Sequence, residues 1–275
     1  MHLKACVRTV ALSSLVLAPG CFGQLLSLEE MRAAIDGVVT MGQARQAVDD
    51  VVEISTSFTI GDGVEAIIEE VRAFLESQAP CSTVEIDPGR SLRIDFGELG
   101  DACTYRGRTY AGEVLYTFEV SGSDVLVTHE YTDFRSEQVT INGRSDVVWG
   151  GGAREVTTDY EIVGTRATLQ EHGTRVMRWI DESQGLGGGV RIDGDSRWDG
   201  PLGVWDLNID GVEARGQDPV PQAGAFELVT PRDILATLSF SRIDEDTIEV
   251  RLEGPRQERI YHVTRLGTVE DVTDE

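Results

Sequence analysis

One cysteine stands where a short apolar run ends, and its position points to chemistry at a thiol. Residues 10–24 read VALSSLVLAPGCFGQ, in which Cys21 follows Ala18-Pro19-Gly20. The apolar run from Val10 to Ala18 has nine residues, which is too short to span a bilayer. A basic start, an apolar centre and a small-residue end are typical of an export signal. The basic start is His2, Lys4 and Arg8.

The stretch Ala18-Pro19-Gly20-Cys21 resembles the lipobox of bacterial lipoproteins. In that family the thiol receives a diacylglyceryl group, the signal is cut before the cysteine, and the new amino terminus is acylated, palmitate being one of the acyl groups. Several acyl chains anchor a protein stably where one chain does not. The match departs from the pattern at Ala18, where leucine is commonest. Phe22 rather than aspartate follows, which by the resemblance implies the outer membrane of a Gram-negative cell. An ordinary secretory signal cut nearby is the alternative.

Two further cysteines are expected to form a disulfide. If Cys21 carries lipid, Cys81 and Cys103 remain as a pair after the signal is removed, and an oxidising compartment lets them bridge. Closing a loop of about twenty residues stabilises a fold by about 3 kcal/mol in the chain-entropy treatment. Metal ligation is the alternative, but neither a second cysteine pair nor a nearby histidine supports it.

Acidic turns raise the question of calcium. Counted from Asp193, an EF-hand loop would need an oxygen ligand where Arg197 stands and glycine where Trp198 stands, so that pattern fails. A looser loop site stays open. Zinc hydrolysis would need three ligands, and the histidines lack metal spacing. We therefore expect neither a metal nor a cofactor. The residues weighed are Asp193, Asp195, Asp199, Asp206, Asp210, His129, His172 and His262.

Signals for catalysis are weak elsewhere too. VSGSDV holds Ser121, Gly122 and Ser123 but lacks the second glycine of a nucleophile elbow. Carboxylates are too abundant for one pair to stand out as a glycosidase pair. Four tryptophans could form a sugar platform, although tryptophan in such a protein is more often core. They are Trp149, Trp179, Trp198 and Trp205.

The charge balance argues against a nucleic-acid partner. The chain has 48 acidic and 24 basic residues, a net charge of −24, and no basic stripe. Such a surface repels nucleic acid and anionic lipid. The expected partner is therefore the membrane, through the lipid anchor, while a protein or small-molecule partner is left open.

The chain after Cys21 is expected to begin with two helices. Ser27-Leu28-Glu29-Glu30 fits a capping box, and an apolar face follows as far as Val51, weakened in its middle by Gly37 and Gly42. Asp62 and Glu65 repeat the box before a second helix, which Pro80 closes. The apolar stripe of that helix is Val64, Ile67, Ile68, Val71, Phe74 and Leu75.

From Cys81 onward the pattern changes to strands. Apolar residues alternate with polar ones in runs such as GEVLYTFEV and TIEVRLE, which predicts half-buried strands. About fourteen strands with short links favour an antiparallel meander. Four dipeptides are expected to form hairpin turns. These are Ser121-Gly122, Asn142-Gly143, Asp193-Gly194 and Asp210-Gly211.

Together these patterns predict an α+β, mainly β fold. Residues 1–20 form the signal, 21–80 a helical segment and 81–275 an antiparallel β domain. So many strands do not remain flat, and the apolar faces of the helices should cover the concave side of a curled sheet. Two blocks, Ile94–Phe118 and Arg197–Leu228, resemble segments of uncharacterised, β-rich bacterial lipoproteins, a resemblance that implies no activity.

We expect a non-enzymatic cell-envelope lipoprotein with a structural or ligand-binding role. The first alternative is a carrier of a lipid or another apolar ligand. It requires an open cavity lined by Tyr116, Phe118, Trp149 and Tyr160, and it fails if Ile67, Val71 and Phe74 fill that space. The weaker alternative is a hydrolase whose catalytic residues are dispersed along the chain.

Overall fold

The computed structural model describes residues 25–55, 63–87, 90–98, 100, 103–122, 124–150, 153–181, 183 and 188–273. Two helices precede a run of strands. The helices are α1 (Leu28–Ser55) and α2 (Val64–Gln78). The strands are β1 (Thr83–Asp87), β2 (Ser91–Asp95), β3 (Cys103–Tyr105), β4 (Arg108–Ser121), β5 (Asp124–Arg135), β6 (Val139–Gly150), β7 (Ala153–Gly164), β8 (Thr168–Trp179), β9 (Val190–Gly200), β10 (Gly203–Ala214), β11 (Ala223–Val229), β12 (Leu235–Arg242), β13 (Thr247–Gly254), β14 (Gln257–Thr264) and β15 (Val269–Asp271).

All strands belong to one antiparallel meander, as predicted. The sheet has 15 strands in the order β1-β2-β4 and then consecutively to β15, with β3 paired to β4 beside this path. Strands β4 to β10 are long, with 11 to 14 residues each. The sheet is open, and β1 and β15 lie at the ends of the order.

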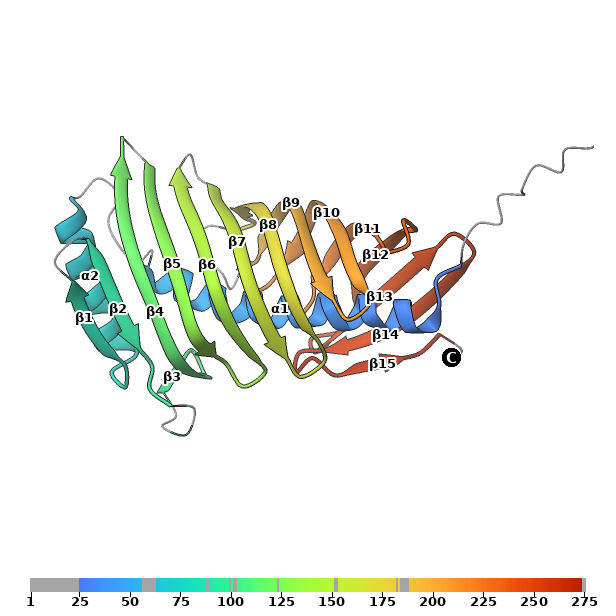
Figure 1. The fold of residues 1–275 in the computed structure, drawn as a ribbon, viewed down its shortest axis with the longest axis horizontal. Coiled ribbons are helices and arrows are strands. Elements are labelled where there is room, and N and C mark those ends of the chain that lie inside the picture. Colours follow the sequence, from blue (N-terminus) through green and yellow to red (C-terminus); the bar gives the residue numbers. More distant parts are fainter. Residues whose placement is uncertain are drawn as a thin grey trace, which may run out of the picture.

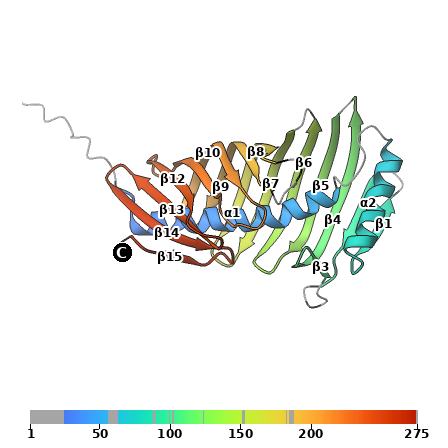
Figure 2. The ribbon, with the colours of Figure 1, turned by 180° about the vertical axis from the view of Figure 1, so that it is seen from behind.

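The sheet curls around α1 (Figure 1). The helix runs along the inside of the curl, with β4 to β10 on one side and β12 to β14 on the other, and α2 lies on the same face near β1 and β2 (Figure 2). Buried residues of both helices and of the sheet form one hydrophobic core. The predicted packing of helices against a concave face is therefore confirmed. Neither described helix is long and apolar enough to cross a membrane.

Three of the four dipeptides predicted to be turns lie inside strands instead. Only Ser121-Gly122 falls at a hairpin, between β4 and β5. Gly143 lies within β6 at φ +128°, where an added Cβ would stand 2.2 Å from the Asp159 carbonyl oxygen. Gly194 and Gly211 lie within β9 and β10, also at positive φ, and the β9–β10 register shifts at Gly211. Glycine inside a strand marks close backbone approach or a bulge, and bulges help a sheet to bend.

Helix α1 continues unbroken through the two glycines that were expected to weaken it. An added Cβ at Gly42 would stand 1.6 Å from the carbonyl oxygen of Pro219, and one at Gly37 would stand 3.1 Å from Trp198 Nε1. The loop before β11 and the sheet therefore approach the helix backbone where it lacks side chains. This contact offsets the helix-forming cost of glycine, which is about 1 kcal/mol per residue.

The second helix differs from the prediction at its start. Its N-cap is Gly63, which makes no side-chain capping bond, whereas a box from Asp62 to Glu65 was expected. Asp62 itself lies outside the described residues. The helix then buries Ile67 and Val71 completely, and Phe74 packs edge-on against Tyr105 at 6.4 Å. The predicted Cys81–Cys103 disulfide is present, with Cα atoms 5.2 Å apart, and joins the end of this helical segment to β3.

Candidate functional site

Helix α1 is buried on nearly all sides although much of it is polar. Burying a polar group costs free energy unless it finds a partner, so the partners of these side chains show how the helix is held. The buried polar residues of α1 are Glu30, Thr40, Gln43, Gln46, Asp49, Asp50 and Ser55.

The first turn of α1 forms the predicted capping box. The backbone amide of Ser27 donates to Glu30 Oε2 at 2.7 Å, and the Ser27 hydroxyl donates to the same oxygen at 2.8 Å. In return, the Glu30 amide donates to Ser27 Oγ at 3.1 Å. Two backbone donors at the start of the helix are thereby satisfied.

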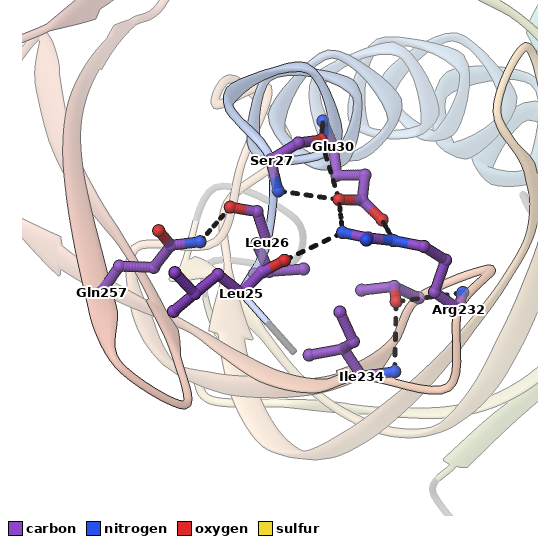
Figure 3. Close-up of polar contacts among 8 residues, drawn as sticks. Leu25, Leu26, Ser27, Glu30, Arg232, Ile234 and Gln257 are labelled. Atoms are coloured by element: carbon purple, nitrogen blue, oxygen red, sulfur yellow. Dashed lines mark hydrogen bonds and ion pairs between the residues drawn. The ribbon is translucent and has the colours of Figure 1, made fainter. Parts of the chain in front are cut away.

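Hydrogen bonds and an ion pair join the capping box, and the two residues before it, to the far end of the sheet. We call the residues that make these contacts the N-terminal clamp. They are Leu25, Leu26, Glu30, Arg232 and Gln257 (Figure 3). Arg232 forms an ion pair with Glu30 and donates from Nη2 to the Leu25 carbonyl at 2.9 Å. Gln257 donates to the carbonyl of Leu26. The clamp therefore holds the chain immediately before α1 against the β11–β12 and β13–β14 turns.

The turn that carries Arg232 is itself held in shape. The amides of Arg232 and Ile234 donate to Thr230 Oγ1 at 3.3 and 3.2 Å. Burial raises the pKa of Glu30, but hydrogen bonds from Arg232 and Ser27 outweigh that effect and hold the pKa below its ordinary value. Glu30 is therefore ionised at neutral pH and suited to its cationic partner.

Further along α1, two carboxylates pair with arginines in the turn before β4 and at the start of β4. Asp50 accepts from Arg108 Nη1 at 2.8 Å and from the hydroxyl of Tyr110. Glu53 pairs with Arg106. Each of these carboxylates thus meets a matching charge.

The end of α1 meets a buried histidine. Ser55 Oγ lies 2.8 Å from His129 Nε2, and both residues are fully buried. Burial lowers the pKa of His129 to about 3, so the imidazole is neutral. A serine beside a histidine is the first element of a nucleophile–base pair. Here His129 Nδ1 has no hydrogen-bond partner among the described residues, and the burial leaves no path for a substrate.

A different arrangement surrounds the middle of α1. Arg45 and Asp49 lie one turn apart on the helix, and Arg154 of β7 and Arg175 of β8 approach from the sheet. Among the described residues none of these three guanidinium groups forms an ion pair. Arg154 is 3% exposed, and its Cζ lies 4.3 Å from the centre of the Trp149 ring. Burial lowers the pKa of Arg45 to about 10, which still leaves its guanidinium charged at pH 7.

The charges of these arginines act on Asp49, but within the described part of the chain it forms no hydrogen bond or ion pair with them. Burial raises its pKa above the ordinary value, while the charges of Arg154, Arg45 and Arg175 act in the opposite direction. Glu171, on β8, accepts from Ser196 Oγ at 2.7 Å through one oxygen only. Its other oxygen, Oε2, is buried without a hydrogen-bond partner in the described part of the chain.

Arg45, Arg175 and Glu171 border a cavity that we call the arginine cavity. It has a volume of about 40 Å³ and is lined at its polar side by Arg45, Tyr160, Glu171 and Arg175. The rest of its wall is largely apolar, with Val38, Ile162, Leu207, Ile209 and Phe226 among the lining residues.

Of the residues considered from the sequence, Tyr160 lines this cavity, whereas the aspartates and histidines considered as metal ligands do not. Cys21 is outside the described residues. The aspartates considered for calcium are spread along β9 and β10, and two of them pair with arginines: Asp193 with Arg178 and Asp206 with Arg197. The described residues contain no group of three or more His, Cys, Asp or Glu placed to hold a metal ion. His129 is a packed residue, while His172 contacts Asp159 on the surface.

The four tryptophans separate into two pairs. Trp198 and Trp205 stack at 5.7 Å and are almost completely buried, as expected for core residues. Trp149 and Trp179 flank Arg154 instead. A sugar platform would need exposed ring faces, and the first pair does not offer them.

Arg45, Asp49, Arg154, Arg175 and Glu171 were not predicted from the sequence. A signal for three of them was present. Arg154 lies two residues before Val156 and is in phase with the buried face of β7, and Arg45 and Asp49 have the spacing of one helical turn. Charged residues at inward positions are unusual enough to mark a site.

Comparisons of the chain with protein-family models, with curated proteins and with solved structures found no match.

Proposed function

We propose that this protein is a lipoprotein of the cell envelope, held at the outer membrane by lipid on Cys21, with a non-enzymatic structural or ligand-binding role. The observation that supports this proposal is the N-terminal clamp. Only three residues separate Cys21 from Leu25, whose carbonyl is bound by Arg232. Four residue steps span at most about 14 Å. Acyl chains on Cys21 would therefore hold this end of the body against the lipid headgroups.

Exposed leucines near the clamp fit this orientation. Leu25 precedes the capping box and Leu28 lies within it, and 50% and 65% of their surfaces are exposed. Leu235, which begins β12 three residues after Arg232, is 60% exposed. Apolar side chains beside a lipid anchor add to membrane binding by burying their area in the interface.

The packing inside the curl does not favour a carrier of apolar ligands. Tyr116 and Phe118 are fully buried, and so are Ile67 and Val71 of α2. Side chains of both helices pack with the sheet in one hydrophobic core. A hydrolase is not favoured either, because the Ser55–His129 pair is sealed in the core.

The proposal is tested by expressing the full chain in a Gram-negative host and comparing wild type with Cys21→Ser. We expect wild type to partition into detergent, with a mass that fits a chain starting at acylated Cys21, and the variant to remain aqueous. The matched control is Cys6→Ser, which lies within the signal and should leave lipidation unchanged. An unmodified thiol at residue 21, or equal partitioning of wild type and Cys21→Ser, would contradict the proposal.

A further inference from the structure

The interior around the middle of α1 carries an unbalanced charge. Two arginines, Arg45 and Arg175, and one carboxyl group, that of Glu171, line the arginine cavity, so its wall has one more cationic than anionic side chain. The adjoining pairs Asp50–Arg108 and Glu53–Arg106 are each neutral and do not change this count. A partly buried guanidinium group without an ion-pair partner is incompletely solvated, so a bound anion would stabilise the site.

The arginine cavity offers space and unused polar atoms at this place. Arg175 Nε is a buried donor, and Glu171 Oε2 is a buried acceptor; neither has a partner among the described residues. Glu171 is itself only 4% exposed and lines the cavity. A volume of about 40 Å³ holds a few water molecules or one small ion. Arg45 and Arg175 are partly exposed, so the cavity is within reach of solvent.

We propose that the arginine cavity binds one small carboxylate anion. Guanidinium groups pair with planar carboxylates through two parallel hydrogen bonds, and a single negative charge matches the excess of one. A phosphate carrying two charges would exceed it. The apolar wall, which includes Ile162, Leu207 and Phe226, suits the carbon end of the ligand.

Glu171 Oε2, which has no hydrogen-bond partner among the described residues, indicates which carboxylates the cavity should prefer. A carboxylate that also carries a hydroxyl group can donate to Glu171 Oε2 while its own carboxylate contacts Arg175 and Arg45. Glycolate has both groups, whereas acetate lacks the hydroxyl. The site should therefore prefer a small hydroxy acid to the corresponding simple acid.

The test is calorimetric titration of the purified full chain with sodium glycolate, sodium acetate and sodium phosphate at constant ionic strength. We expect saturable binding of glycolate, weaker binding of acetate and none of phosphate. Arg175→Gln should weaken glycolate binding at least tenfold. The matched control is Arg256→Gln, an exposed arginine on the β13–β14 turn, which should bind as wild type does.

A second measurement covers the case in which Arg175→Gln does not fold. In the wild-type protein, glycolate should shift the NMR signals of a small set of arginine Nε–H groups and leave the remainder unchanged, with the same dissociation constant as in calorimetry. Absence of glycolate binding to wild type, equal binding of phosphate, or unchanged binding by folded Arg175→Gln would overturn the proposal.

Discussion

At the scale of single residues, His129 is the clearest case of burial controlling protonation. The imidazole is fully buried, bonded to Ser55 and packed edge-on against Tyr116 at 4.9 Å. Its pKa of about 3 lies below the ordinary value of 6.5 because burial disfavours the charged form. The nearby charge of Arg154 acts in the same direction, while Asp146 opposes it.

This shift predicts a loss of stability in mild acid. The unfolded chain takes up a proton near pH 6.5 and the folded chain does not, so the stabilisation is complete above that pH and is lost as the pH falls towards 3. His129→Gln lacks this group. The difference in unfolding free energy between wild type and variant should therefore shrink by about 1.4 kcal/mol per pH unit below about pH 6. Urea denaturation from pH 7 to 4.5 measures it, and parallel curves for the two proteins would contradict the assignment.

Some of the residues discussed above could be predicted from the sequence, and others could not. Cys81 and Cys103 were predicted because few cysteines leave few pairings. Arg154 could have been found by extending the alternation of β7, because strand phase fixes which face a side chain takes. The meeting of Arg175 with Arg45 could not, since it depends on how the sheet curls around the helix.

At the scale of elements, we expect alanine substitutions at the two glycines of α1 to lower the stability of the protein by different amounts. An alanine methyl at Gly42 would overlap the Pro219 carbonyl, so the helix and the loop must separate. We expect Gly42→Ala to lower the unfolding free energy by about 2 kcal/mol or more, against the gain of about 1 kcal/mol that this change gives in a free helix.

The matched comparison is Gly37→Ala, where the nearest atoms belong to the Trp198 ring at 3.1 to 3.3 Å. This side chain has more freedom to adjust than the backbone at Pro219, so the loss should be smaller. Denaturant midpoints of the two variants and wild type give the order. A Gly42→Ala protein at least as stable as wild type would show that the loop does not pack as described.

The disulfide makes a second prediction at this scale. It links residues 22 apart, joining the segment after α2 to β3. The double variant Cys81→Ser/Cys103→Ser should lose about 3 kcal/mol of unfolding free energy, because the unfolded chain regains loop entropy. Wild type in reducing conditions should show the same loss. If the variant and the oxidised protein unfold at the same urea concentration, the bridge does not constrain the unfolded chain in this way.

The sequence predicted the types of the elements well, but it predicted the turns between them less well. The capping box at Ser27 and the two-residue alternation are local signals, and both reappear in the structure. The dipeptides Asn142-Gly143 and Asp193-Gly194 suggested turns because their composition suits positive φ. They lie inside long strands because neighbouring backbones approach closely there, and the local sequence does not report that approach.

At the scale of the whole molecule, one curled sheet wraps a helix and provides partners for some of its buried polar residues, such as Glu30, Asp50 and Ser55. The alternation of short runs was enough to predict an antiparallel meander, since no segment after residue 80 could serve as a long crossover. The position of α1 depends on long-range pairs such as Glu30–Arg232 and Asp50–Arg108, which join residues 202 and 58 positions apart. Those ion pairs could not be predicted from one amino-acid sequence alone.

We propose an orientation in which the clamped end of the molecule faces the membrane. It is tested most directly by quenching a fluorophore at Leu235→Cys or, as a control, at Val120→Cys near the β4–β5 hairpin, in lipidated protein on vesicles that carry nitroxide lipids. We expect strong quenching at residue 235 and little at residue 120. Equal quenching at the two sites, or stronger quenching at residue 120, would contradict a body held to the bilayer by its N-terminal clamp.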